Sequence, residues 1–79
     1  MLPYRKLREE NGALLYEHAI ERDPDHTGLV SIDLTTGEAA ALDHLDRPSY
    51  MHCAAKLRLG LEKQFKNDSL KDSGWIIWG

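Results

Sequence analysis

The chain has few of the features that cross-link a small protein or place it in a membrane. It has 79 residues and a single cysteine, Cys53, so no disulfide can form within it. One cysteine is typical of a reducing compartment, and we expect a cytoplasmic protein. No apolar run approaches the ~20 residues that a membrane helix needs. The N-terminal segment leads into charged residues, so we also expect no signal peptide and no membrane partner.

Basic residues are outnumbered by acidic ones, ten to thirteen, and the charge is unevenly placed. The net charge is −3 at pH 7. Residues 1–46 carry four basic and ten acidic side chains, whereas residues 47–79 carry six basic and three acidic ones. The surface of a dedicated DNA-binding protein is uniformly basic, so we do not expect nucleic acid as the partner. The acidic and basic halves could instead attract each other, within the fold or between copies.

The chain has no internal repeat and no low-complexity segment, and its length suffices for one domain. We predict a single domain over residues 1–79, with residues 1–10 as a flexible or helical N-terminal segment. Apolar residues make up 42% of the sequence and are patterned, which argues against disorder.

The clearest local signal is a β-hairpin. Residues 29–34 alternate apolar and polar side chains, which is the periodicity of a strand. The Thr-Thr-Gly sequence at residues 35–37 has the length of a three-residue hairpin loop, in which Gly37 takes a positive φ. We therefore predict a hairpin whose second strand covers residues 38–42.

Residues 13–22 fit both a helix and a strand. Their composition favours a helix, but their even-numbered residues from 14 to 20 could form one face of a strand. The Asn11-Gly12 dipeptide before them and residues 23–28 after them are both turn signals. We predict a strand, because it completes a three-stranded meander with the hairpin and gives a helix a whole surface to cover.

A long helix should follow. Pro48 marks its first turn, and the polar cluster at residues 67–69 marks its end. Apolar residues recur between them at three- and four-residue intervals, at Tyr50, Cys53, Ala54, Leu57, Leu61 and Phe65. Cys53 lies on this apolar arc, so we interpret it as a small core residue and not as a nucleophile beside His52.

The chain ends on its most apolar stretch, and residues 74–78 are predicted to form the last strand. Trp75 and Ile77 would lie on one face of this strand, and Ile76 and Trp78 on the other. The predicted fold class is therefore α+β. It is a small antiparallel sheet of three to four strands (a β-meander, then a helix, then a C-terminal strand) with one long helix packed on one face.

This order of elements and the Gly-Trp-Ile-Ile-Trp-Gly ending resemble small bacterial α+β proteins of unknown function. The resemblance covers about residues 10–79. It is carried by Tyr16-Glu17, by Ile32-Asp33 with Thr36-Gly37-Glu38, and by Gly74 with Trp78-Gly79. It implies the fold order alone and brings no catalytic motif.

Four histidines raise the question of a metal site. The best ligand set is His44, Asp46 and His52, around the start of the predicted helix. Zinc sites usually contain two histidines about three to five residues apart, and that spacing does not occur here. We therefore interpret the four histidines as surface residues in acidic loops, and we expect no metal and no cofactor.

Two surfaces are candidates for binding a partner. One is the apolar C-terminal stretch, namely Trp75, Ile76, Ile77 and Trp78. The other is a stripe on the predicted helix that contains Lys56, Leu59 and Lys63. We expect a non-enzymatic protein-interaction module that binds a protein partner or a second copy through its C-terminal strand, although tryptophans are equally good core residues. The alternatives are a nucleic-acid-associated protein that uses the basic helix face and a histidine/aspartate metal-dependent enzyme.

Overall fold

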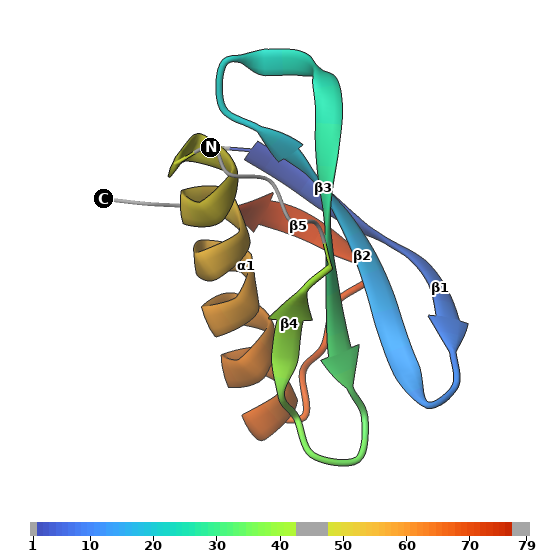
Figure 1. Cartoon of the computed structure of the whole chain (residues 1–79). Coiled ribbons are helices and arrows are strands. Elements are labelled where there is room, and N and C mark those ends of the chain that lie inside the picture. Colours follow the sequence, from blue (N-terminus) through green and yellow to red (C-terminus); the bar gives the residue numbers. More distant parts are fainter. Residues whose placement is uncertain (1, 43–47, 77–79) are drawn as a thin grey trace.

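A computed structural model of the chain describes residues 2–42 and 48–76. Its elements are β1 (Leu2–Glu10), β2 (Ala13–Ile20), β3 (Asp23–Asp33), β4 (Ala39–Ala41), α1 (Pro48–Lys66) and β5 (Ser73–Ile76). The strands form one antiparallel sheet in the order β4-β3-β2-β1-β5. The helix connects the two edge strands and lies across one face of the sheet, leaving the other face without a covering element of the described chain (Figure 1).

The predicted α+β class is confirmed, but the sheet has five strands and not three to four. The extra strand is β1, in the segment that the sequence predicted to be flexible or helical. Two properties of β1 remove the alternation of apolar and polar residues that would have predicted a strand. Most of its side chains are charged and exposed, and a bulge between Lys6 and Arg8 breaks the alternation. The Asn11-Gly12 turn, with φ of 53° and 80°, then forces this segment back along β2.

The interpretation of residues 13–22 as a strand is confirmed for β2, so the tertiary context overrides helix propensity here. The turn predicted over residues 23–28 is wrong. The chain turns earlier, at Arg22 with φ of 63°, and β3 starts at Asp23. Residues 24–27 extend the strand beyond the core as an exposed, mostly polar segment, and they therefore lack the alternation that would have revealed a strand.

The hairpin predicted at residues 29–42 forms between β3 and β4. Gly37 takes a φ of 79°, and its N–H donates to the Asp33 carbonyl over 2.8 Å. The Asp33 carboxylate also accepts from the Thr35 N–H over 2.7 Å, which tightens the loop. β4 is shorter than predicted because only Ala39–Ala41 pair with β3.

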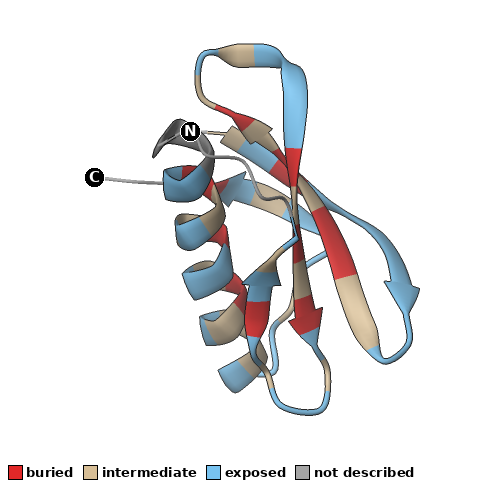
Figure 2. Ribbon diagram, in the orientation of Figure 1, coloured by how far each residue is buried: buried red, intermediate tan, exposed pale blue. Residues whose placement is uncertain are grey.

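The core fills the space between α1 and the sheet (Figure 2). Its buried members are Tyr4, Tyr16, Val30, Ile32, Ala39, Leu57, Leu61 and Ile76. The rings of Tyr4 and Tyr16 meet edge to face, with centroids 5.8 Å apart. Cys53 is fully buried, as its place on the apolar arc predicted. Because α1 covers this face alone, residues of the opposite parity in each strand point away from the helix.

The helix spans Pro48–Lys66, close to the predicted limits. Beyond it, the Ser69 N–H donates to the Gln64 carbonyl over 2.8 Å, and Asp68 takes a positive φ of 51°, which closes the last turn. The last strand, predicted over residues 74–78, forms as β5 and begins one residue earlier, at Ser73; residues 77 and 78 lie outside the described residues. Within the described chain, no helix has the length and apolarity required to cross a membrane.

Candidate functional site

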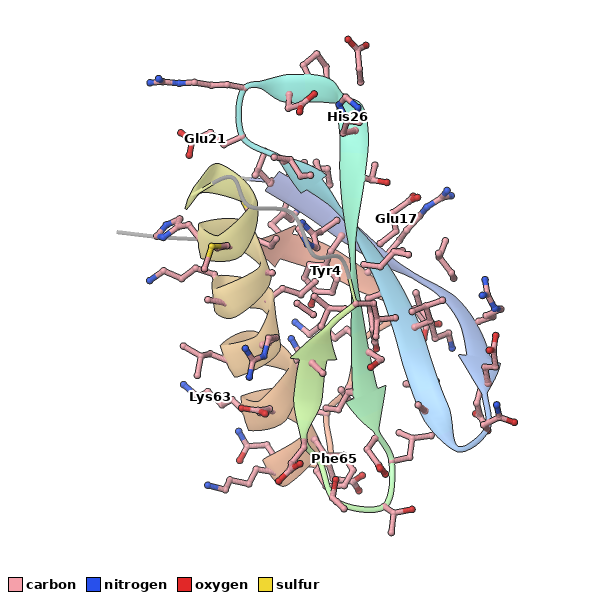
Figure 3. The ribbon with its side chains drawn as sticks, viewed as in Figure 1. Tyr4, Glu17, Glu21, His26, Lys63 and Phe65 are labelled. Carbon is pink, nitrogen blue, oxygen red and sulfur yellow. The ribbon has the colours of Figure 1, made fainter. Side chains whose placement is uncertain are left out.

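The face of the sheet that α1 leaves uncovered is the candidate functional site, and we call it the open face. The register places Trp75 opposite Pro3, Arg5 opposite Glu17, and Glu17 opposite Leu29. The open face consists of Pro3, Arg5, Leu7, Arg8, Leu15, Glu17, Ala19, Thr27, Leu29, Ser31 and Trp75. Figure 3 shows Glu17 pointing away from the helix, whereas Tyr4 points between the helix and the sheet.

A polar row crosses the middle of the open face. The Arg5 guanidinium donates to Glu17 Oε1, with N–O distances of 3.2 and 3.3 Å. The Thr27 hydroxyl donates to Glu17 Oε2 over 3.3 Å. Both carboxylate oxygens of Glu17 therefore accept hydrogen bonds, which orient the charged and polar groups of this row. Because the Arg5 side chain is 69% exposed, the pair contributes little to stability and remains accessible to a partner.

Apolar side chains flank this row on both sides. Trp75 lies on one side and is 60% exposed. On the other side, the β1 bulge sets Leu7 and Arg8 together opposite Leu15. Leu7 is 37% exposed, and Leu15 is nearly buried beneath its neighbours. In a sheet covered by helices on one face, the other face normally alternates to polar residues, so this apolar content is unusual.

A shallow depression of about 230 Å³ lies beside the polar row. It is lined by Pro3, Tyr4, Arg5, Glu17, His18, Ala19 and Thr27. Ligand sites in enzymes usually enclose ~300–1,000 Å³, so this depression is smaller and shallower than a typical substrate pocket. A side chain of a docking protein would fit it better than a whole metabolite.

The two edges of the sheet differ in whether their outward backbone groups are hydrogen-bonded. At the β4 edge, the Ala39 N–H donates to Glu62 Oε2 over 2.9 Å, and Arg58 Nε donates to the Ala39 carbonyl over 3.1 Å. Two helix side chains thus occupy both outward backbone groups of Ala39. At the β5 edge, no group among residues 2–42 and 48–76 makes an equivalent hydrogen bond on the outer side.

The structure separates the residues predicted at the C-terminal strand. Trp75 belongs to the open face, whereas Ile76 is 4% exposed and lies in the core. A partner can therefore reach Trp75 but not the Ile76 side chain. Ile77 and Trp78, the other two predicted residues, lie outside the described residues.

The predicted helix stripe lies on the far side of the molecule from the open face. Leu59 is 65% exposed, Lys63 is exposed, and Lys56 is half-buried. In Figure 3, Lys63 points away from the sheet. A wide groove of about 700 Å³ separates the end of α1 from the β3–β4 loop, and its lining contains Lys63, Lys66, Glu38 and Glu62. This mixture of charges is unlike the continuous positive surface that a nucleic-acid backbone requires.

The predicted metal ligands are not brought together in the described part of the chain. His44 and Asp46 lie outside it, and His52 is exposed on α1. Among the described residues, no three histidine, cysteine, aspartate or glutamate side chains are grouped closely enough to hold a metal ion.

The interpretation of all four histidines as surface residues is wrong for His18, which is 2% exposed. Its Nδ1 lies 2.9 Å from the Ala19 carbonyl oxygen, so Nδ1 carries the proton, and its Nε2 is buried without a hydrogen-bond partner. The alternation of residues 14–20 was the signal that could have identified it, since it places His18 beside Tyr16 and Ile20 on the core face.

Tyr16 is the buried titratable group with the clearest perturbation. Burial raises the pKa of Tyr16 to about 12, and the nearby Tyr4 and Asp72 act in the same direction. Its hydroxyl donates to the Lys71 carbonyl over 2.8 Å and thereby links β2 to the segment before β5. The side chain is fully buried, so it serves the fold and not acid–base chemistry.

Comparisons with known proteins add no relative. The sequence matches no protein-family model, and searches of curated proteins and of solved structures gave no match. We therefore infer the function from the surface of the molecule.

Proposed function

We propose that this chain is a non-enzymatic protein-interaction module that binds another protein through the open face of its sheet. The observation that carries the proposal is the exposure of Trp75 on a sheet face that also presents Leu7. Tryptophan is one of the residues that most often contribute a large share of the binding energy at protein interfaces. Because Trp75 is 60% exposed, most of the hydrophobic free energy that its burial could provide is not gained within this chain.

The composition of the open face supports the same proposal. Protein interfaces combine an apolar centre with arginine and aromatic side chains and a polar rim. Here the Arg5–Glu17–Thr27 row supplies oriented polar groups between two apolar patches. The depression beside this row has the size of a side chain, which favours a protein over a small substrate.

We also propose a cytoplasmic location. The only cysteine, Cys53, is a buried free thiol in the core, which suits a compartment where thiols stay reduced.

Photo-crosslinking in cells tests the proposed binding surface. A benzoylphenylalanine residue replaces Trp75 in one variant and Leu59 in another. These two positions have similar exposure, 60% and 65%, but lie on opposite sides of the molecule. We expect a discrete protein adduct from position 75 and none from position 59. Equal labelling from the two positions, or no adduct from position 75, would contradict the proposal.

A further inference from the structure

We propose that the partner is a second copy of the chain, which adds its own β5 to the β5 edge next to Trp75, so that the sheet and its open face continue across both molecules. This inference rests on the proposed function and names its partner. The first support comes from the hydrogen-bonding parity of β5. The Lys6 N–H donates to the Asp72 carbonyl over 2.6 Å, so Lys6 and Asp72 are a hydrogen-bonded pair of the β1–β5 ladder.

Hydrogen-bonded and non-hydrogen-bonded pairs alternate along an antiparallel ladder. Gly74 and Ile76 therefore direct their backbone groups toward β1, opposite Tyr4 and Leu2. Ser73 and Trp75 direct their N–H and C=O groups to the outer side of the sheet. Pro3 agrees with this assignment, because it has no N–H to offer and stands opposite Trp75 in a non-hydrogen-bonded pair.

The second support is that no residue in the described ranges 2–42 and 48–76 protects the β5 edge. Natural sheets blunt exposed edges with charged residues, prolines, bulges or covering elements. The β4 edge is covered, since Arg58 and Glu62 of α1 bond to both backbone groups of Ala39. In contrast, β5 has the uncharged sequence Ser-Gly-Trp-Ile, and it pairs with β1 without a register shift.

The identity of the partner follows from symmetry. A strand that pairs antiparallel with its own copy is related to it by a two-fold axis, so each chain satisfies the other and the assembly closes. With the axis at Gly74, Ser73 of one copy exchanges backbone hydrogen bonds with Trp75 of the other. The small Ser73 side chain then leaves room for the indole of the second copy on the open face. Because Ala39 at the β4 edge is already bonded to α1, that edge offers fewer free groups for continuing the sheet into a fibre.

Ser73→Pro tests this geometry selectively. It removes an outward N–H that β1 does not use, and proline is tolerated at the first residue of a strand. Ser73→Ala is the matched control, since it keeps the N–H and removes only the hydroxyl. Sedimentation equilibrium from low-micromolar to millimolar protein should show the wild type and Ser73→Ala rising from 9.0 kDa toward twice that mass. The Ser73→Pro dimer should have a dissociation constant at least about tenfold higher than that of the wild type.

Hydrogen exchange of the wild type gives a second readout that needs no variant. The Ser73 and Trp75 amides should exchange more slowly as protein concentration rises. A wild-type protein that stays monomeric would overturn the inference. It would also be overturned if the wild type associates but Ser73→Pro associates with the same affinity and the Trp75 amide is not protected from exchange. In both cases, a Trp75 photo-adduct with a different protein would leave the proposed function standing. Its absence would remove both proposals.

Discussion

The imidazole of His18 lies against the backbone of Gly28, its register partner on β3. A Cβ built on Gly28 would overlap the Nε2 and Cε1 atoms of this ring. His18 is 2% exposed, so the ring has no solvent-filled space into which it can move. Gly28→Ala should therefore destabilise the protein, although alanine is ordinarily the better residue of the two in a strand.

The expected cost follows from the overlap. Inserting a methyl group into a packed core usually costs about 1–3 kcal/mol, and the rigid imidazole places this case at about 2–3 kcal/mol. In a His18→Ala background the overlap no longer exists, so the added methyl group should cost nothing or stabilise slightly. The two substitutions should thus show a coupling free energy of about 2–3 kcal/mol, and sites without contact would show almost none.

Urea unfolding of the wild type, both single variants and the double variant measures this coupling. Gly60→Ala is the matched control, because outside its chain neighbours and the adjacent helix backbone no atom lies within 4 Å of the Cβ position at Gly60. That control should raise the free energy of unfolding by about 0.5–1 kcal/mol. If Gly28→Ala were as mild as Gly60→Ala, or if the double variant were additive, the packing of His18 described here would be refuted.

Two further predictions concern the core. Gly37→Ala should lower the free energy of unfolding by about 2–3 kcal/mol, because φ at Gly37 is 79° and the new Cβ would crowd the Phe65 ring. Urea unfolding measures this loss, and an unchanged midpoint would contradict the prediction. The pKa of Tyr16 is about 12 in the fold against 10.0 in the unfolded chain, so the fold keeps a proton that the unfolded chain releases. The contribution of Tyr16 to the free energy of unfolding should therefore be constant below pH 10 and fall by about 2–3 kcal/mol as pH rises to 12. Urea unfolding across this pH range should show a shallower fall for Tyr16→Phe, and equal slopes would contradict the assignment.

The local signals in the sequence were sufficient for the elements that alternate or repeat cleanly. The hairpin around Gly37 and the helix from Pro48 carry turn, proline and periodicity signals that agree with their tertiary roles. The composition of residues 13–20 favours a helix. They were predicted to form a strand only because the later helix needs a sheet surface to pack against.

The remaining features depend on long-range pairing. In β1 the charged residues and the bulge erase the alternation, and the strand is specified mainly by the Asn11-Gly12 turn that returns it to β2. The start of β3 at Asp23 is likewise set by the conformation of Arg22 and not by apolar pattern. The missed β1 explains why the sequence predicted too few strands, and the missed start at Asp23 explains why β3 was predicted too short.

The candidate site was only partly accessible from the sequence. The alternation of the last strand predicts opposite faces for Trp75 and Ile76, but which face meets α1 depends on pairing with β1. The open face could not be assembled from the sequence, because Leu7 enters it through the bulge and Arg5 through its register with Glu17.

A photo-crosslinker scan over both faces of the molecule shows most directly whether the open face is where this chain meets another protein. The probe replaces Leu7 and Trp75 on the open face, and Ala55 and Leu59 on exposed positions of the helix. We expect protein adducts at the first two positions and background labelling at the last two. Adducts confined to the helix, or spread evenly over all four positions, would contradict it.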